Sequence, residues 1–97
     1  MLNDKKIRLI GLANRAGCVH AGTFVTEKLI KEGKAPFVVV AADGSEKQTE
    51  KIMKLLHKYE VDYIVYGTKD DLGRILGKSE TISLVITDTN FINGIKN

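Results

Sequence analysis

Hydrophobic positions recur along the first third of the chain with the spacing of helices. Residues 4–16 (DKKIRLIGLANRA) and residues 21–33 (AGTFVTEKLIKEG) each carry apolar side chains three or four positions apart, and Gly17 and Gly33 end the two segments. Residues 18–21 (CVHA) form a short predicted strand between them. In the first helix, the side chains expected to be buried are Ile7, Leu9, Ile10, Leu12, Ala13 and Ala16.

The rest of the chain alternates strands with helices. Residues 37–42 (FVVVAA) form an uninterrupted apolar run, which is typical of a strand buried on both faces. A helix is predicted within residues 43–59, where Ser45 and Gln48 have the spacing of a capping box. The remaining predicted elements are a strand at 62–67, a helix at 68–77 that starts at Thr68 and ends at Gly77, a strand at 81–87 and a helix at 88–96.

This order of elements, in which helices and strands alternate from end to end, predicts the fold class. Strands that alternate with helices pack into a sheet covered on both faces. We expect an α/β protein, a three-layer α/β/α sandwich around a central mixed four-stranded sheet. At 97 residues the chain has room for one such core, so residues 1–97 are expected to form a single domain.

One aromatic residue of the second predicted helix falls outside its apolar stripe. When each residue turns a helix by about 100°, Phe24 lies between Lys28 and Lys31 on the charged face. The opposite, core-facing side is then formed by Val25, Thr26, Leu29, Ile30 and Gly33. Three interpretations of Phe24 are open: ordinary core under a neighbouring element, an anchor for another protein, or a platform on which an RNA base stacks between phosphate-binding lysines.

The two residues before Phe24 are compatible with the third interpretation. A helix start carries unpaired N–H groups and the positive end of the helix dipole. A glycine there, such as Gly22 before Thr23, lets a phosphate or a base edge approach the backbone closely. Glycine and threonine are also common as plain helix caps, so the pair fits both roles.

Basic residues are concentrated in the first third of the chain. Residues 1–34 hold seven Lys and Arg against three Asp and Glu, whereas residues 35–97 hold eight against nine, for a net charge of +3. Such an asymmetry indicates an anionic partner, most often a nucleic acid, unless the lysines only keep the protein soluble. Lys5, Arg8 and Arg15 lie near one stripe of the first helix, which either extends such a surface or is the solvated face of the helix.

Other function classes find little support in the residues. No apolar run approaches about 20 residues, and the first residues do not form a signal peptide, so we expect a cytoplasmic protein without membrane contact. The single cysteine, Cys18, excludes an intramolecular disulfide and a multi-cysteine zinc site. A reactive thiol at Cys18 beside His20 is conceivable, but a lone cysteine is more often a small buried residue. We therefore expect no enzyme, no metal, no cofactor and no small-molecule substrate.

Two motifs together resemble a known family. In AGTFVTEKLIKEGKAPFVVVAADGSE, a Gly-Thr pair opens a helix, a lysine follows within two turns, and a glycine precedes a strand that ends in Ala-x-Asp. In DLGRILGKSETISLVITD, Leu-Gly-x-x-x-Gly precedes the last strand. Their order and spacing resemble the ribosomal L7Ae/L30e superfamily of RNA-binding proteins. The opening IRLIGLANRAGCVHAG is similar to its small bacterial YlxQ-like branch.

The resemblance implies an α/β/α sandwich that binds structured RNA, typically a kink-turn, without catalysis. In the family, the start of the second helix and the loop before the last strand form the RNA surface. The matching positions in this chain are Gly22, Thr23, Lys28, Leu72, Gly73, Gly77, Lys78 and Ser79.

The chain departs from the family pattern beside the first motif. Kink-turn proteins usually follow Gly-Thr with Asn-Glu, which read the sheared G·A pairs, whereas this chain has Phe24 and Val25. Phe24 offers stacking but none of the hydrogen bonds of an asparagine. Glu80 adds a negative charge to the second loop. These differences favour generic or differently specific RNA binding over kink-turn recognition of the usual kind.

The resulting hypothesis is a monomeric, non-catalytic RNA-binding protein associated with the ribosome or its assembly, with ribosomal RNA as its partner. Phosphate contacts are expected from Arg15, Lys28, Lys31 and Lys34. We expect the backbone of Gly22 and Thr23 to approach the RNA, and Phe24 to stack on a base or wedge beside it. The second wall of the site is expected to consist of Arg74, Lys78 and Ser79, and Gly73 is also expected at the RNA-binding surface. The alternative is a protein–protein adaptor, for example a homodimer, that uses Phe24 as its apolar anchor.

Overall fold

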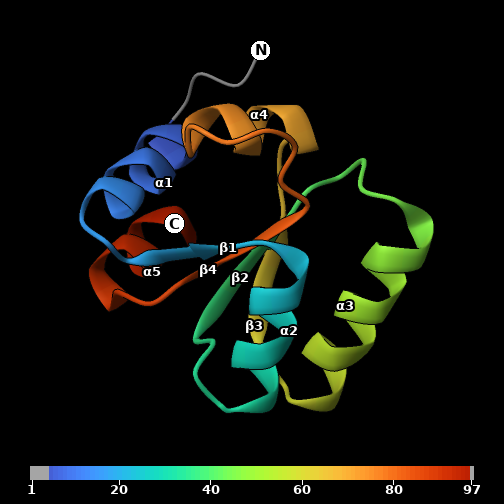
Figure 1. The fold of residues 1–97 in the computed structure, drawn as a ribbon. Coiled ribbons are helices and arrows are strands. Elements are labelled where there is room, and N and C mark those ends of the chain that lie inside the picture. Colours follow the sequence, from blue (N-terminus) through green and yellow to red (C-terminus); the bar gives the residue numbers. More distant parts are fainter. Residues whose placement is uncertain (1–4, 97) are drawn as a thin grey trace.

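The computed structural model describes residues 5–96, which form five helices and four strands in alternation (Figure 1). In chain order these are α1 (Lys5–Arg15), β1 (Val19–Ala21), α2 (Thr23–Lys31), β2 (Phe37–Val40), α3 (Glu46–Lys58), β3 (Asp62–Val65), α4 (Lys69–Ile75), β4 (Ser83–Ile86) and α5 (Thr89–Lys96). Each lies within its predicted range, although the predicted first residue, Asp4, lies outside the described residues. Within residues 5–96, no helix is long and apolar enough to cross a membrane.

The four strands form one mixed sheet in the order β1-β4-β2-β3. β4 is antiparallel to both neighbours, and its Val85 lies opposite His20 of β1 and opposite Val38 of β2. β2 and β3 run parallel. Because β2 and β4 occupy the middle of the sheet, every residue of both strands is buried, as their apolar runs predict.

Helices cover both faces of this sheet (Figure 1). α1, α4 and α5 pack on one face, over side chains such as Phe37 and Leu84 of the central strands. α2 and α3 pack on the other face, over Val38 and Val85. Neighbouring residues of each central strand thus point into different clusters, as the pleat of a strand requires. The predicted three-layer α/β/α sandwich with a mixed four-stranded sheet is confirmed.

Three side chains that the helical periodicity assigns to the core lie at the surface or its edge. Leu12 is 48% exposed and Ala16 is also exposed, because α1 buries only Ile10 and Ala13 fully. Val25 is partly buried and joins neither core cluster. The reason is that α2 is rotated so that Thr26 and Ile30 face the sheet most directly.

Two buried hydroxyl groups fix the start of α2 against the sheet. The Thr26 hydroxyl donates to the Gly22 carbonyl at 2.7 Å, and the Ser83 hydroxyl of β4 donates to Thr26 Oγ1 at 2.9 Å. Both side chains are fully buried. A buried hydroxyl without a partner costs about 1–3 kcal/mol, so these two groups depend on one another. Together they hold the N-terminal turn of α2 in position on β4.

Thr26→Val should destabilise the protein by about 1–3 kcal/mol, because it leaves the buried Ser83 hydroxyl without its acceptor. Ser83→Ala should cost about 1 kcal/mol, the net worth of one hydrogen bond. The double variant should cost less than the two single costs together, because it leaves no orphaned hydroxyl. Urea unfolding of the four proteins measures this coupling, and strictly additive costs would contradict it.

Candidate nucleic-acid interface

The start of α2 and the loop between α4 and β4 line a common groove of about 690 Å³. Its lining residues are Ala21, Gly22, Thr23, Gln48, Lys78, Ser79, Glu80, Thr81 and Ile82. The pairing of β1 with β4, which sets Ala21 opposite Leu84, brings the two segments together. Four predicted site residues that are far apart in the sequence therefore lie in one groove: Gly22, Thr23, Lys78 and Ser79.

Gly22 precedes α2 in a backbone conformation that favours glycine, with φ at 117°. Its N–H donates to the Ser83 carbonyl at 2.9 Å, which fixes the direction in which the chain enters the helix. Within the described residues, no side chain caps this helix start. The N–H groups of its first turn and the positive end of the helix dipole are therefore available to an anionic ligand.

Gly73 allows the second wall of the groove to pack on α4. A β-carbon at this position would lie 1.7 Å from the carbonyl oxygen of Ser79, which is far inside van der Waals contact. The Lys78 N–H also donates to the Gly73 carbonyl at 2.8 Å. Gly73 and its neighbour Leu72 are buried, so the structure shows Gly73 shaping this wall of the groove.

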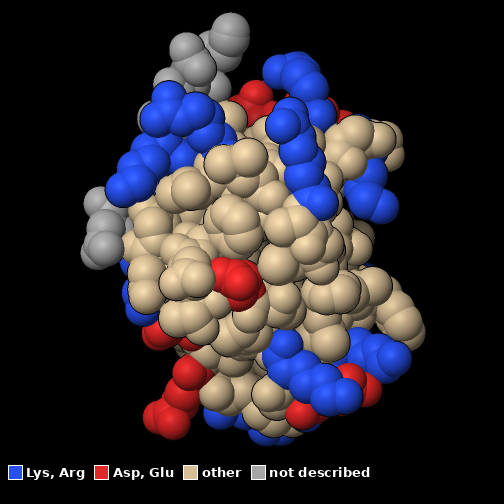
Figure 2. Space-filling model, turned by 90° about the vertical axis from the view of Figure 1, so that its left-hand side faces the viewer, with Lys and Arg blue, Asp and Glu red and all other residues tan. Residues whose placement is uncertain are grey.

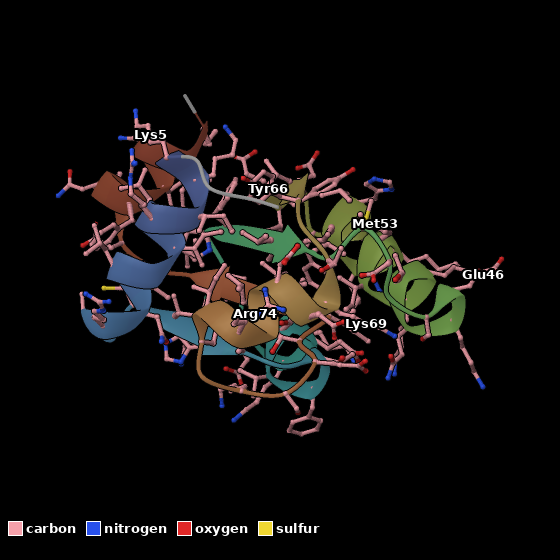
Figure 3. The ribbon with its side chains drawn as sticks, turned by 90° about the horizontal axis from the view of Figure 1, so that it is seen from above. Lys5, Glu46, Met53, Tyr66, Lys69 and Arg74 are labelled. Carbon is pink, nitrogen blue, oxygen red and sulfur yellow. The ribbon has the colours of Figure 1, made fainter. Side chains whose placement is uncertain are left out.

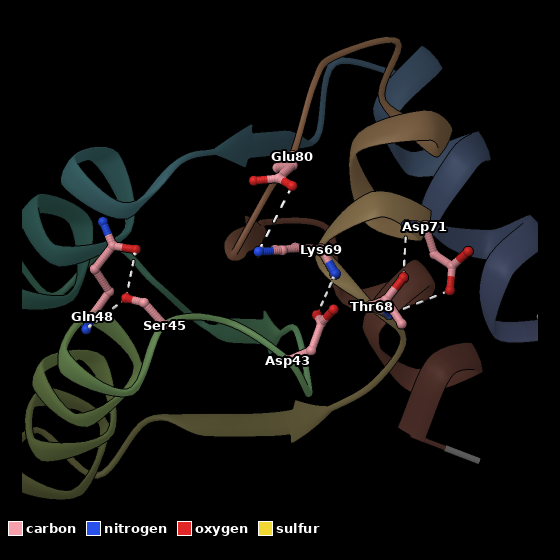
Figure 4. Close-up of polar contacts among 7 residues, drawn as sticks. All are labelled: Asp43, Ser45, Gln48, Thr68, Lys69, Asp71 and Glu80. Carbon is pink, nitrogen blue, oxygen red and sulfur yellow. Dashed lines mark hydrogen bonds and ion pairs between the residues drawn. The ribbon is translucent and has the colours of Figure 1, made fainter.

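Lys69 ties this loop to the turn that follows β2 (Figure 4). Its backbone N–H donates to Asp43 Oδ1 at 2.7 Å, and its carbonyl accepts from the Thr81 N–H at 3.0 Å. Its ammonium lies 3.7 Å from the Glu80 carboxylate. The negative charge of Glu80 is therefore partly neutralised within the protein, and it does not stand alone in the loop.

A capping box fixes the first turn of α4 behind the same loop. The Thr68 hydroxyl accepts from the Asp71 N–H at 3.0 Å, and the Asp71 carboxylate accepts from the Thr68 N–H at 3.3 Å. Hydrogen bonds from the side chain and then the backbone of Thr68 lower the pKa of Asp71. This contribution to stability is complete above the ordinary aspartate pKa and is lost as the pH falls through the lowered value.

Phe24 stands at the edge of the groove as an exposed ring. Its side chain is 79% exposed and belongs to neither core cluster, so the interpretation as ordinary core is wrong. Lys28, one turn further along α2, is also exposed, and among residues 5–96 no carboxylate forms an ion pair with it. An aromatic face and an unpaired ammonium group thus lie side by side on one helix.

Two predicted lysines lie at the other end of α2. Lys31 is in the last turn, about 12 Å along the helix axis from Thr23 at 1.5 Å per residue. Lys34 follows the helix and pairs with Glu32, at 4.0 Å between Nζ and Oε1. Lys31 was expected on the same helical face as Phe24, but its place at the end of the helix sets it away from the groove, and Lys34 lies further on.

The two predicted arginines lie on the side of the 77–79 loop that faces away from α2. Arg15 ends α1 and, with Gly77, lines a second groove between α1 and α4. Arg74 is exposed on α4, and its guanidinium is 3.6 Å from the Asp71 carboxylate. Figure 3 shows α4 from above, with Arg74 and Lys69 on it and α1 beside it. Arg15 and Arg74 are therefore outside the first groove.

Gln48 is the groove residue that sequence reasoning assigned only to a cap. Its N–H donates to Ser45 Oγ as expected for an N-cap, and its side-chain oxygen accepts from the same hydroxyl at 3.0 Å. It also lines the groove opposite Lys78 and Ser79. Only the packing of α3 beside α2 brings Gln48 there, and the spacing within the chain carries no signal of it.

Cys18 and the histidines take no part in this groove. Cys18 is half-buried, and its thiol lies 3.7 Å from the carbonyl oxygen of Ala16. In the part of the chain that the structure describes, no three His, Cys, Asp or Glu side chains come together as metal ligands.

Gly73→Ala should displace the 77–79 loop, since the new methyl group meets the backbone at Ser79 rather than a movable side chain. We expect a loss of stability of about 1–3 kcal/mol, as for other overpacked positions. Gly11→Ala is the matched control, because its β-carbon would be at an ordinary 3.6 Å from Ile75. Thermal unfolding of the two variants tests this, and equal melting temperatures would contradict the shaping role.

Comparison with known proteins identifies relatives of this chain. The family model described as "Ribosomal protein L7Ae/L30e/S12e/Gadd45 family" matches residues 5–94. The chain is 33% identical over 85 residues to the RNA-binding protein YlxQ of Bacillus subtilis, covering 88% of this chain and 85% of that protein. It is 33% identical over 93 residues to YlxQ of Enterococcus faecium, covering 96% and 89%. It is 35% identical over 83 residues to the large ribosomal subunit protein eL30 of Methanopyrus kandleri, covering 84% and 76%.

Solved structures share the fold. A Bacillus halodurans protein of unknown function superimposes with a TM-score of 0.87 at 25% identity, over 98% of this chain and 100% of that one. The 15.5 kD RNA-binding protein of Giardia lamblia superimposes with a TM-score of 0.76 at 22% identity, over 99% and 86%. From the family match and the YlxQ relatives together, the chain belongs to the ribosomal protein L7Ae/L30e/S12e/Gadd45 family, in its bacterial YlxQ-like branch.

Proposed function

We propose that this protein is a non-catalytic RNA-binding protein of the cytoplasm that recognises structured RNA and acts on the ribosome or during its assembly. The observation that carries the proposal is the convergence of the two motifs on one groove. That groove combines free helix N–H donors with Lys78, and the helix that begins at it, α2, carries the exposed ring of Phe24 and the unpaired Lys28. Such a set offers phosphate contacts and a stacking surface side by side.

Each part of the groove has a role in this proposal. The first turn of α2 receives a phosphate or a base edge at Gly22 and Thr23, where no β-carbon of residue 22 stands in the way. Lys28 and Lys78 neutralise phosphates on either side. Phe24 stacks on an unpaired base, and Ser79 and Gln48 offer hydrogen bonds along the opposite wall. Lys31 and Lys34 are omitted from this contact set because Lys31 lies in the last turn of α2 and Lys34 lies beyond it.

The names of the relatives support the proposal. The Bacillus subtilis and Enterococcus faecium proteins are named RNA-binding proteins, and the Methanopyrus kandleri protein is named a large ribosomal subunit protein. These names favour RNA as the partner of this chain, and ribosomal RNA is the first RNA to test.

Phe24→Ala should weaken binding to a ribosomal RNA fragment by about 5- to 150-fold, which corresponds to the roughly 1–3 kcal/mol of one stacked base. Lys28→Ala should also weaken binding and should reduce the slope of log affinity against log salt by about 0.7–0.9. The control is Lys54→Ala on α3, whose ammonium is exposed and pairs only with Glu50 at 3.2 Å among the described residues. Mobility shift at several salt concentrations measures all three.

The proposed groove is refuted if Phe24→Ala and Lys28→Ala both bind the ribosomal RNA fragment as tightly as the wild type does. The exposure of Phe24 also fits a protein–protein adaptor. If sedimentation shows a dimer that Phe24→Glu dissociates, and no ribosomal RNA fragment binds, the adaptor function replaces RNA binding.

A second prediction concerns the kind of RNA. In the family pattern the residues after Gly-Thr are Asn-Glu, and Val25 is only partly buried here, so a glutamate at this position is tolerated. The double variant F24N/V25E should therefore gain a preference for a hairpin with two sheared G·A pairs over the same hairpin with Watson–Crick pairs there. The gain should be about tenfold, the value of one hydrogen bond to a charged or strongly polar partner. A wild-type protein that already discriminates as strongly as the variant would contradict this expectation.

A further inference from the structure

A second groove of about 650 Å³ lies between α1 and α4, outside the site proposed above. Its apolar lining includes Leu12, Ile75 and Leu76, and its polar lining includes Arg8, Arg15 and Asn14. Leu12 is 48% exposed, although the periodicity of α1 assigns it to the core. Nothing in the described chain covers this leucine, so its exposure requires an explanation.

The groove is bordered by two arginines on one face of α1. Arg8, Leu12 and Arg15 are spaced by four and three residues, so they form one stripe in which the leucine lies between the two guanidinium groups. Both arginines are exposed, and within residues 5–96 no carboxylate forms an ion pair with either. Figure 2 shows this side of the molecule, where basic side chains gather near the top and the middle is largely uncharged.

The second groove adjoins the first across the loop after α4. Gly77 lines the α1–α4 groove, while the next two residues, Lys78 and Ser79, line the groove at the start of α2. The loop is therefore a narrow ridge with a groove on each side. On both sides an exposed apolar side chain stands beside exposed basic ones: Phe24 by Lys28, and Leu12 by Arg8 and Arg15.

We propose that the α1–α4 groove binds a single-stranded segment of the same RNA, continuing from the first groove over the ridge at Gly77. Arg8 and Arg15, about 10 Å apart along α1, contact two different phosphates of the strand. An unstacked base lies on Leu12 and Ile75, and the Asn14 amide faces its edge. This inference rests on the proposed function, because it requires the first groove to hold RNA.

Charge and continuity favour RNA over an acidic protein as the occupant. Arginine forms bidentate hydrogen bonds with phosphate as well as with carboxylate, so the arginines alone fit both partners. An RNA strand bound beside Lys78 in the first groove can extend to Gly77 and so enter the second groove. A protein partner would instead have to dock in the second groove independently, beside the bound RNA. The alternating phosphates and bases of an unpaired strand also match the arrangement of two cations around one apolar side chain.

The test compares two RNA probes that differ only at one end. The first is the shortest ribosomal RNA fragment that binds the wild-type protein, and the second carries six additional unpaired uridines at its 5′ or its 3′ end. We expect one of the two extensions to tighten binding about tenfold, as one or two charge-assisted contacts do. The double variant R8A/R15A should lose this gain while binding the short probe as the wild type does. For R8A/R15A on the extended probe, the slope of log affinity against log salt should be smaller by about 1.4, since each single-strand phosphate contact contributes about 0.7.

Two further variants control for general effects. K54A/K58A removes the same charge from α3 and should keep the gain from the extension. Leu12→Ser should lower the gain without changing the short-probe affinity, and its exposed position makes it safe for folding. Urea unfolding checks that all variants fold as the wild type does.

The possible outcomes distinguish a failure of this inference from a failure of the proposed function. The inference is overturned if neither extension tightens binding, if K54A/K58A loses the gain as well, or if R8A/R15A weakens the short probe equally. It is also overturned if an acidic protein captured from the source cell binds the purified chain through Leu12 and Arg15 while the extended RNA does not compete. If no ribosomal RNA fragment binds the wild type at all, the proposed function itself fails.

Discussion

The absence of a side chain at residue 73 is the constraint on which the groove depends. Because Gly73 lets the Ser79 carbonyl lie directly on α4, the segment after this helix folds back as a ridge instead of extending into solvent. Lys69 then fixes the other side of the ridge to the turn after β2 through Asp43. The close contact between the backbone at Gly73 and the backbone at Ser79 thus positions the loop that separates the two grooves.

The fold could be predicted from the sequence because it follows from local signals, whereas the grouping of the two motifs was expected only from the resemblance to the family. The apolar runs, the caps at Ser45 and Thr68, and the glycines that end helices each specify their own segment. What could not be predicted was the rotation of each helix about its axis. A shift of a fraction of a turn exposes Leu12 and moves Val25 to the edge of the core.

The residues predicted to contact RNA show the same limit of prediction from sequence. Phe24 was placed on the charged face correctly, whereas its exposure depended on whether another element covered that face. Lys31 shares the charged face of Phe24 but lies far from the groove, because a helical wheel records angle and ignores distance along the axis. The ion-pair partner of Glu80 and the place of Gln48 in the groove were also beyond reach, since both depend on tertiary neighbours rather than on the chain on either side.

The central place of β4 has a consequence for the order in which the protein acquires its structure. β1 pairs only with β4 among the described strands, and Gly22 and Thr26 are held by Ser83 of that same strand. Such pairings between distant parts of the chain form late in folding, because the closure of a long loop must precede them. During synthesis the start of α2 therefore lacks its support until residue 86 has left the ribosome. The groove is therefore completed only together with the sheet.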